Sequence, residues 1–198
     1  GAQHSQSPFA VYRCIPGLKV VCPATPYDAK GLLLAAIADE NPVIDIDDRW
    51  LYDEEGPVPE EYYTTPIGKA NILRQGTDIS IIAASYMVKE AMAAAQLLQN
   101  EGISCEVVDL RTLQPIDMVT VNHSVAKTGR AVVAIAEWES CGVASHVGRM
   151  IYEKNFRNLK APVQLVTLPN LPAPASHDLE KEYYPNRDCV VKAVQECW

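Results

Sequence analysis

The sequence lacks the patterns that would place it in a membrane, on a nucleic acid or around a zinc ion. No stretch approaches the roughly 18 consecutive apolar residues that a membrane span needs, and no basic and then apolar signal opens the chain. Lys and Arg number 17 against 25 Asp and Glu, which leaves no excess of cations for a polyanion. The six cysteines form no C-x-x-C pair. We therefore expect a protein of the cytoplasm, or of a mitochondrial or plastid matrix, with no nucleic-acid or membrane partner.

The first 50 residues predict one strand–helix–strand unit. Apolar runs at 18–22 and 42–46 are typical of strands, and a helical pattern covers 26–39 between them. Thr25 is placed to cap this helix, with Asp28 in its first turn. One helix cannot bury both faces of a sheet. We therefore expect residues 1–50 to be the end of an α/β domain whose beginning is absent.

A second α/β pattern starts after a connection rich in Asp, Glu, Pro and Tyr. We place the linker at 51–66 and a complete domain at 67–198. Strands are expected at 79–84, 104–109, 131–136 and 163–167, and helices at 87–101, 118–127, 143–156 and 188–196. Strands that alternate with helices of this length predict an open, mainly parallel sheet covered by helices on both faces.

Five sequence blocks carry a family resemblance. They are GAQHSQS at 1–7, AAIADENPV at 35–43, IGKANILRQGTDISIIA at 67–83, CEVVDLRTLQPID at 105–117 and LPNLPAPASHDLE at 168–180. In this order they resemble the beta subunit of thiamine-diphosphate-dependent 2-oxoacid dehydrogenases, a family that includes the pyruvate, branched-chain and acetoin enzymes. The resemblance implies a remnant of the thiamine pyrimidine-binding domain at 1–50 and a transketolase C-terminal-like domain at 67–198.

The resemblance also implies a function and a set of partners. Such enzymes decarboxylate a 2-oxoacid oxidatively and pass the acyl group to a lipoyl acyltransferase. In this family an alpha subunit holds thiamine diphosphate and magnesium through a GDG…N motif, and a second beta subunit completes the assembly. This sequence contains no GDG. We therefore expect that the chain alone neither holds the cofactor nor turns over, and that it serves mainly in assembly; the resemblance leaves the 2-oxoacid undetermined.

His4 is the catalytic candidate. In the family's GAQHSQ segment the histidine faces the thiazolium and the substrate carboxylate, so the resemblance implies that His4 orients the 2-oxoacid and stabilises charge as CO2 leaves. Without that motif, a histidine in an irregular segment is a solvent-exposed residue. No residue of this chain is expected to bind the thiamine cofactor itself.

A potassium site is the second implication of the resemblance. Ala36, Ile37, Asp39 and Asn41 stand where the family coordinates a structural potassium ion with backbone and side-chain oxygens. The carbonyls at a helix C-terminus suit such a hard cation. The alternative is that Asp39 and Asn41 only end the helix, with Asn41 in a left-handed conformation.

Several readings stay open. A two-chain transketolase-like ketol or acyl transferase, or a non-catalytic dimerisation module, would share these domains. Arg111 is expected to pair with Asp109 or Asp117, or to contact a neighbouring subunit. The turn at 137–144 has one glycine and two glutamates, so we interpret it as a loop or interface and not as a phosphate site.

Overall fold

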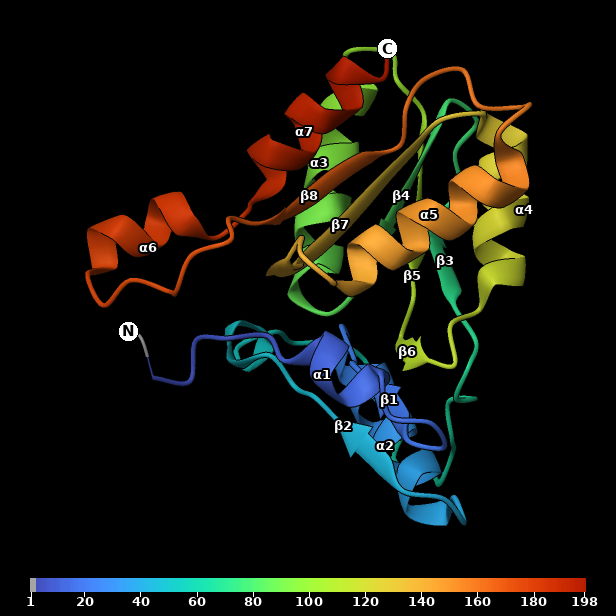
Figure 1. The fold of residues 1–198 in the computed structure, drawn as a ribbon. Coiled ribbons are helices and arrows are strands. Elements are labelled where there is room, and N and C mark those ends of the chain that lie inside the picture. Colours follow the sequence, from blue (N-terminus) through green and yellow to red (C-terminus); the bar gives the residue numbers. More distant parts are fainter. Residues whose placement is uncertain (1–2) are drawn as a thin grey trace.

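The computed structural model describes residues 3–198, which form two sheets flanked by helices (Figure 1). The strands are β1 (Lys19–Val21), β2 (Val43–Asp45), β3 (Asn71–Arg74), β4 (Ile79–Ala83), β5 (Cys105–Asp109), β6 (Thr112–Gln114), β7 (Ala131–Trp138) and β8 (Gln164–Leu168). The helices are α1 (Phe9–Arg13), α2 (Pro26–Ala38), the short 3-10 helix η1 (Arg49–Leu51), α3 (Tyr86–Asn100), α4 (Met118–Thr128), α5 (Val143–Asn155), α6 (His177–Tyr183) and α7 (Arg187–Glu196).

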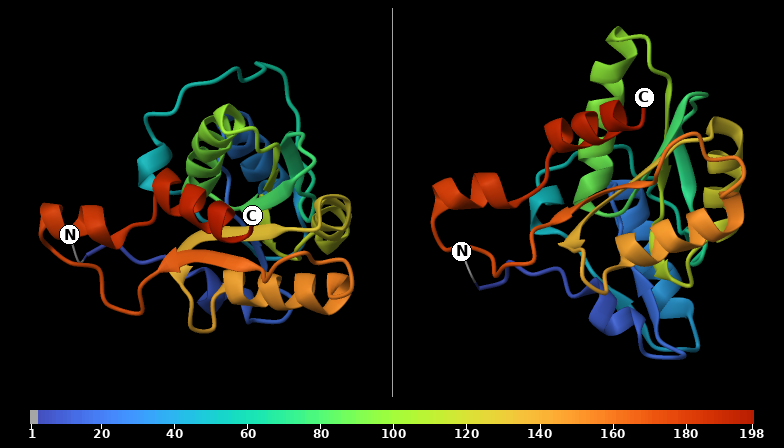
Figure 2. Two further views of the ribbon diagram at one scale, coloured as in Figure 1. Left: turned by 90° about the horizontal axis from the view of Figure 1, so that it is seen from above. Right: turned by 45° about the horizontal axis from the view of Figure 1, so that its top comes forward.

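The larger sheet confirms the predicted α/β class. Its order is β3-β5-β4-β7-β8, and all neighbours are parallel except β3, which runs antiparallel to β5 at one edge. Figure 2 shows α3 and α7 on one face of this sheet and α4 and α5 on the other. Strands β4 and β5 are buried along their whole length, as expected for parallel strands covered on both faces.

The smaller sheet contains a strand from each part of the chain. Its order is β2-β1-β6, with β2 parallel and β6 antiparallel to β1. Val20 pairs with Gln114, and Phe9 and Val20 belong to the same buried cluster as Ile82 and Val133 of the larger sheet. The N-terminal part therefore shares a hydrophobic core with the rest of the chain.

Local signals for helix ends agree with the structure. Thr25 Oγ1 accepts a hydrogen bond from the Asp28 amide at 3.1 Å, which caps α2. Gly102 and Gly129 follow α3 and α4 with φ of 83° and 75°, the left-handed conformation that ends a helix without a Cβ clash. Capping acts within one helical turn, so the sequence predicts it well.

Five short elements were not predicted. They are α1, η1, β3, β6 and α6. Helix α1 has five residues, too few for a helical period, and β6 has three. β3 is a half-buried edge strand without alternation, and α6 follows a proline-rich stretch. Each depends on tertiary neighbours more than on its own pattern.

The connection at 51–66 runs along α2 and has no regular structure beyond η1. The Thr65 amide donates to the Gly31 carbonyl at 2.9 Å, and the Tyr63 ring stacks on Tyr27 with centroids 4.5 Å apart. We propose the division into 1–50, 51–66 and 67–198. Within residues 3–198, no helix is long and apolar enough to cross a membrane.

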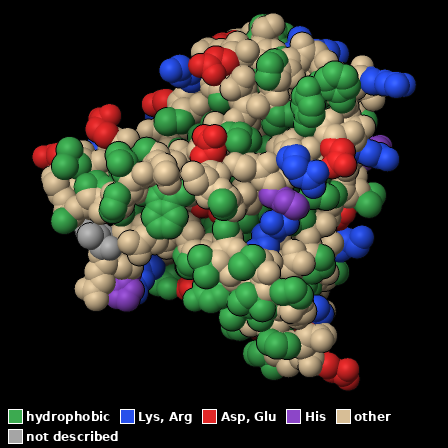
Figure 3. All heavy atoms as spheres, viewed as in Figure 1, with side chains coloured by type: hydrophobic (Ala, Val, Ile, Leu, Met, Phe, Trp, Pro, Cys, Tyr) green, Lys and Arg blue, Asp and Glu red, His purple; other side chains and the backbone are tan. Residues whose placement is uncertain are grey.

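Hydrophobic side chains remain exposed on the N-terminal part. Figure 3 shows them gathered over the end of the molecule that holds the smaller sheet. Val11 and Ile15, in and after α1, and Leu33 and Ile37 of α2 are among the exposed ones, and Ile37 is 73% exposed. Apolar side chains gathered at one end of a molecule are typical of a contact surface for another chain.

Candidate functional site

His4 lies in a pocket of about 480 Å³ between the N-terminal segment and α6. The walls are the segment 3–9, the loop 46–50 after β2, Ser85 and Tyr86 at the start of α3, Ala136 of β7, and Glu180 and Tyr184 at α6. The pocket is therefore beyond the carboxyl ends of the parallel strands β4 and β7. Open α/β sheets bind their ligands at this edge.

The segment that carries His4 is held in an uncommon backbone conformation. His4 has a φ of 59°, a left-handed value that side chains with a Cβ adopt at a cost. Ser5 Oγ donates to the Gln3 carbonyl at 3.2 Å, and the Tyr184 hydroxyl donates to the Ser5 carbonyl at 2.9 Å. Gly1 and Ala2 of the GAQHSQS block lie outside the described residues. His4 is an exposed residue and is one of those that line the pocket.

Aromatic rings from separate segments line the same pocket. Trp50 makes edge-to-face contacts with Tyr86 and with Tyr184, each with centroids 4.8 Å apart, and Tyr184 contacts Tyr183 at 5.0 Å. The sequence carries no signal for this group, because its members come from η1, the start of α3 and the end of α6. Only the tertiary fold brings them to His4.

Two buried carboxyl groups, Asp109 and Glu137, and the half-buried Asp45 lie at the ends of the strands around Cys22. Burial raises the pKa of Asp109 to about 7 and that of Glu137 to about 7, and burial with the neighbouring Asp47 raises the pKa of Asp45 to about 6. Each keeps one buried oxygen without a hydrogen-bond partner in the described part of the chain. All three raise the pKa of the buried Cys22 thiol, after burial itself. These groups were not predicted as a cluster.

We expect the stability of the chain to fall between about pH 4 and pH 7. The folded pKa of Asp109 is about 7 against an ordinary 3.8, so the folded state keeps a proton that the unfolded state releases. By linkage the free energy of unfolding then decreases as the pH rises, by on the order of 4 kcal/mol for this group. Asp109→Asn should flatten the slope, measured by urea unfolding at several pH values. Asp53→Asn, at an exposed aspartate, is the control, and an unchanged slope in Asp109→Asn contradicts the prediction.

Arg111 does not pair as expected from the sequence. Its guanidinium contacts Asp28 Oδ1 of α2 at 2.9 Å, with side chains only 14% and 1% exposed. The Asp109 carboxylate accepts the Arg111 backbone amide instead, and Asp117 caps α4 by accepting from the Thr120 amide. The prediction of a side-chain pair with Asp109 or Asp117 is therefore wrong. The actual ion pair joins the N-terminal part to the loop after β5.

The predicted potassium residues are placed together at the end of α2, where the Asp39 carboxylate and the Ala36 carbonyl already have hydrogen-bond partners. Asp39 is the C-cap of α2, and its carboxylate pairs with the Lys19 ammonium and accepts from the Asn41 amide and side chain. Lys19 and Asn41 lower the pKa of Asp39 to about 2. The Ala36 carbonyl accepts from the Asp39 amide, and Ile37 is exposed. With an ammonium already on Asp39, these residues do not fit a ready-made potassium cage. The backbone of Asn41 is not left-handed, so the prediction of a left-handed Asn41 at the end of the helix is wrong.

In the turn at 137–144, the Glu137 carboxylate accepts a hydrogen bond at the start of α5. Glu137 Oε1 accepts from the Ala144 amide at 2.8 Å, and Gly142 packs so closely on Trp138 that a Cβ would lie 2.2 Å from its carbonyl oxygen. The amides that a phosphate would use are therefore engaged. Within residues 3–198 there is also no group of three or more His, Cys, Asp or Glu side chains that could hold a metal ion.

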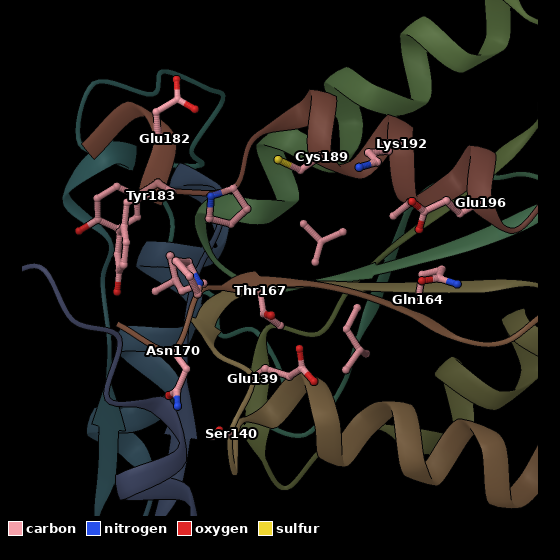
Figure 4. A pocket seen from close by; sticks show the side chains of 17 residues that line it. Glu139, Ser140, Gln164, Thr167, Asn170, Glu182, Tyr183, Cys189, Lys192 and Glu196 are labelled. Carbon is pink, nitrogen blue, oxygen red and sulfur yellow. The ribbon is translucent and has the colours of Figure 1, made fainter. Parts of the chain in front are cut away.

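A larger pocket of about 730 Å³ opens along the outer edge of β8 and contains none of the predicted site residues. Figure 4 shows it between α7 and β8, with Glu139 and Ser140 on the α5 side. Its charged lining consists of Lys192 and three glutamates. The pocket with His4 is the one at the carboxyl ends of the strands, and we take it as the candidate site.

Comparisons with known proteins agree with this arrangement. The family model described as "Transketolase, C-terminal domain" matches residues 68–190, and "Transketolase, pyrimidine binding domain" matches residues 1–53. The chain is 46% identical to the acetoin:2,6-dichlorophenolindophenol oxidoreductase subunit beta of Cupriavidus necator, over 98% of this chain and 58% of that protein. It is 42% identical to the pyruvate dehydrogenase E1 component subunit beta of Rickettsia felis, over 98% of this chain and 60% of that protein.

A solved structure is also similar. The protein described as "Split gene transketolase, inactive beta4 tetramer" superposes with a TM-score of 0.77 at 28% identity, over 100% of this chain and 63% of that chain. The present chain thus spans about three fifths of the length of the relatives it matches.

Proposed function

This chain belongs to the transketolase C-terminal domain family, next to a match to its pyrimidine-binding domain, and from that premise we propose that it acts in a 2-oxoacid dehydrogenase. The proposed reaction is the oxidative decarboxylation of a 2-oxoacid, with transfer of the acyl group to a lipoyl acyltransferase. The proposal is supported by the similarity to beta subunits of acetoin and pyruvate enzymes. The chain would work in the cytoplasm or in an organelle matrix.

The observation that carries the proposal is the position of His4 at the open end of the parallel strands. His4 is exposed and lines a pocket of about 480 Å³, which is large enough for a small substrate. A histidine there donates a hydrogen bond or a positive charge to a carboxylate, and it stabilises charge that develops as CO2 departs. Orientation and electrostatics are what a protein contributes to cofactor chemistry.

Thiamine diphosphate supplies the electron sink for the carbanion when it is bound. The described residues fit one side of such a site, because His4 is available, but they offer no set of three acidic or histidine ligands for magnesium. We therefore propose that an alpha subunit holds the diphosphate and magnesium. A second beta subunit and the lipoyl acyltransferase complete the proposed assembly, and the exposed side chains Val11, Ile15, Leu33 and Ile37 support a subunit contact.

Assembly without catalysis is the alternative that an observation favours. The split-gene transketolase to which the chain is similar is described as an inactive tetramer of beta chains. A ketol or acyl transferase made of two chains would use the same domains. The acceptor of the transferred group therefore distinguishes a dehydrogenase from a transferase.

The test is reconstitution. We expect the chain alone to release no CO2 from pyruvate or a branched-chain 2-oxoacid when thiamine diphosphate and magnesium are added. A beta subunit that contains this chain, assembled with its alpha subunit, should release CO2 and acylate a lipoyl domain. Release of CO2 by the chain alone would overturn the proposal. Transfer to an aldose in place of the lipoyl domain would instead support the transferase.

A further inference from the structure

Tyr184 joins the C-terminal part of the chain to the residue that follows His4. Its hydroxyl donates to the Ser5 carbonyl at 2.9 Å, across almost the whole length of the sequence. Figure 1 shows the start of the chain running beside α6, and Tyr184 directly follows that helix. The peptide that carries the Ser5 carbonyl is only one residue from the His4 side chain.

The Tyr184 ring is itself held in place on two sides. Trp50 and Tyr183 make edge contacts with it at 4.8 and 5.0 Å. Tyr183 and Trp138 in turn donate to the Leu171 carbonyl at 2.8 and 2.9 Å. Burial raises the pKa of Tyr184, so its hydroxyl keeps its proton at neutral pH and remains a donor. The Tyr184 hydroxyl is therefore a hydrogen-bond donor whose ring is held in place by Trp50 and Tyr183.

The His4 segment needs such support. The left-handed φ of His4 costs about 1 kcal/mol and persists only where surrounding contacts impose it. Phe9 is buried and holds the far end of the segment in the core. Ser5 lies between this attachment and His4, so a hydrogen bond to its carbonyl limits how far the imidazole can move.

We propose that Tyr184 is a positioning residue for His4: its hydroxyl holds the Ser5 peptide and so aims the imidazole into the pocket between β7, η1 and α6. The contacts of Tyr184 support its role in holding the Ser5 peptide. The effect of Tyr184 on catalysis rests on the proposed function. A net contribution of about 1 kcal/mol for such a hydrogen bond corresponds to about a fivefold change in the population of the held conformation.

The structural test is hydrogen exchange in peptides that cover residues 3–7. Tyr184→Phe removes the donor and keeps the ring against Trp50, so exchange should become about fivefold faster there. Tyr152→Phe is the matched control, because it removes the hydroxyl of a half-exposed ring on α5. Unchanged exchange in Tyr184→Phe overturns the holding role whatever the catalytic result is.

The catalytic test is a double-mutant cycle in the assembled enzyme. Tyr184→Phe should lower kcat about fivefold to tenfold with little change in KM, and it should have no further effect once His4 is replaced by alanine. An equal loss in the His4→Ala background overturns the claim that Tyr184 acts through His4. If His4→Ala alone keeps its turnover, the proposed function of His4 fails, while the exchange result still reports on Tyr184.

Discussion

Replacing His4 by alanine in the assembled enzyme should lower kcat by roughly two to three powers of ten, the usual cost of losing one positioned electrostatic donor. His4 lines the pocket, where we propose that the substrate carboxylate binds. The affinity for thiamine diphosphate should barely change, because we propose that the diphosphate and magnesium are held by another subunit. Steady-state kinetics and a cofactor titration measure the two quantities separately.

Two further variants make this test specific. His4→Asn keeps a polar side chain that tolerates the left-handed φ of 59°, so it removes the imidazole without adding backbone strain. His123→Ala changes an exposed histidine on α4 and should leave kcat unchanged. If His4→Ala raises KM and leaves kcat alone, His4 binds the ground state and the transition state equally. Ordinary values of both constants would remove His4 from the site.

Replacing Asp28 by alanine should cost roughly 3–5 kcal/mol of unfolding free energy, because it leaves the Arg111 guanidinium buried without its carboxylate. Asp28 is 1% exposed and also accepts hydrogen bonds from Thr65 and Thr25, at 3.3 and 3.0 Å. The contacts with Thr65 and Arg111 hold α2 against the connection and the loop after β5, while the contact with Thr25 lies within the cap of α2. Urea unfolding followed by circular dichroism measures the change.

The control for this prediction is an exposed ion pair. Asp178→Ala breaks a contact with Lys181 in which the side chains are 90% and 62% exposed, and it should change stability by less than about 1 kcal/mol. The double variant Asp28→Leu with Arg111→Met should recover much of the loss, since it removes both buried charges. A small effect of Asp28→Ala by itself would mean that water replaces the carboxylate at Arg111.

Part of the site could be predicted from the sequence because its signal is a short contiguous block. GAQHSQS singled out His4, which in the structure lines a pocket beyond the carboxyl ends of β4 and β7; its catalytic role stays a prediction. The potassium residues at 36–41 were found in the same way, yet the structure shows Lys19 on the Asp39 carboxylate. A local block identifies which residues are present. It does not show that the Lys19 ammonium of the neighbouring strand β1 pairs with Asp39.

The sequence by itself determined the elements whose signals act within a few residues. The apolar runs that form β4 and β7 can be recognised from residue type alone. The Thr25 cap and the left-handed Gly129 reflect hydrogen bonds and sterics within one helical turn. These free-energy terms are nearly independent of the rest of the fold, so they can be read along the chain.

Only the tertiary structure decided the pairings between distant segments. β6 joins β1, Arg111 pairs with Asp28, and Tyr184 meets Ser5, in each case across a long stretch of chain. Each contact depends on where the core places both partners, and no local free energy distinguishes Asp28 from Asp109 or Asp117 as a partner for the same guanidinium. The position of Arg111 beside α2 resolves that choice, because the ion pair forms where the two carboxylate oxygens and the guanidinium are buried together.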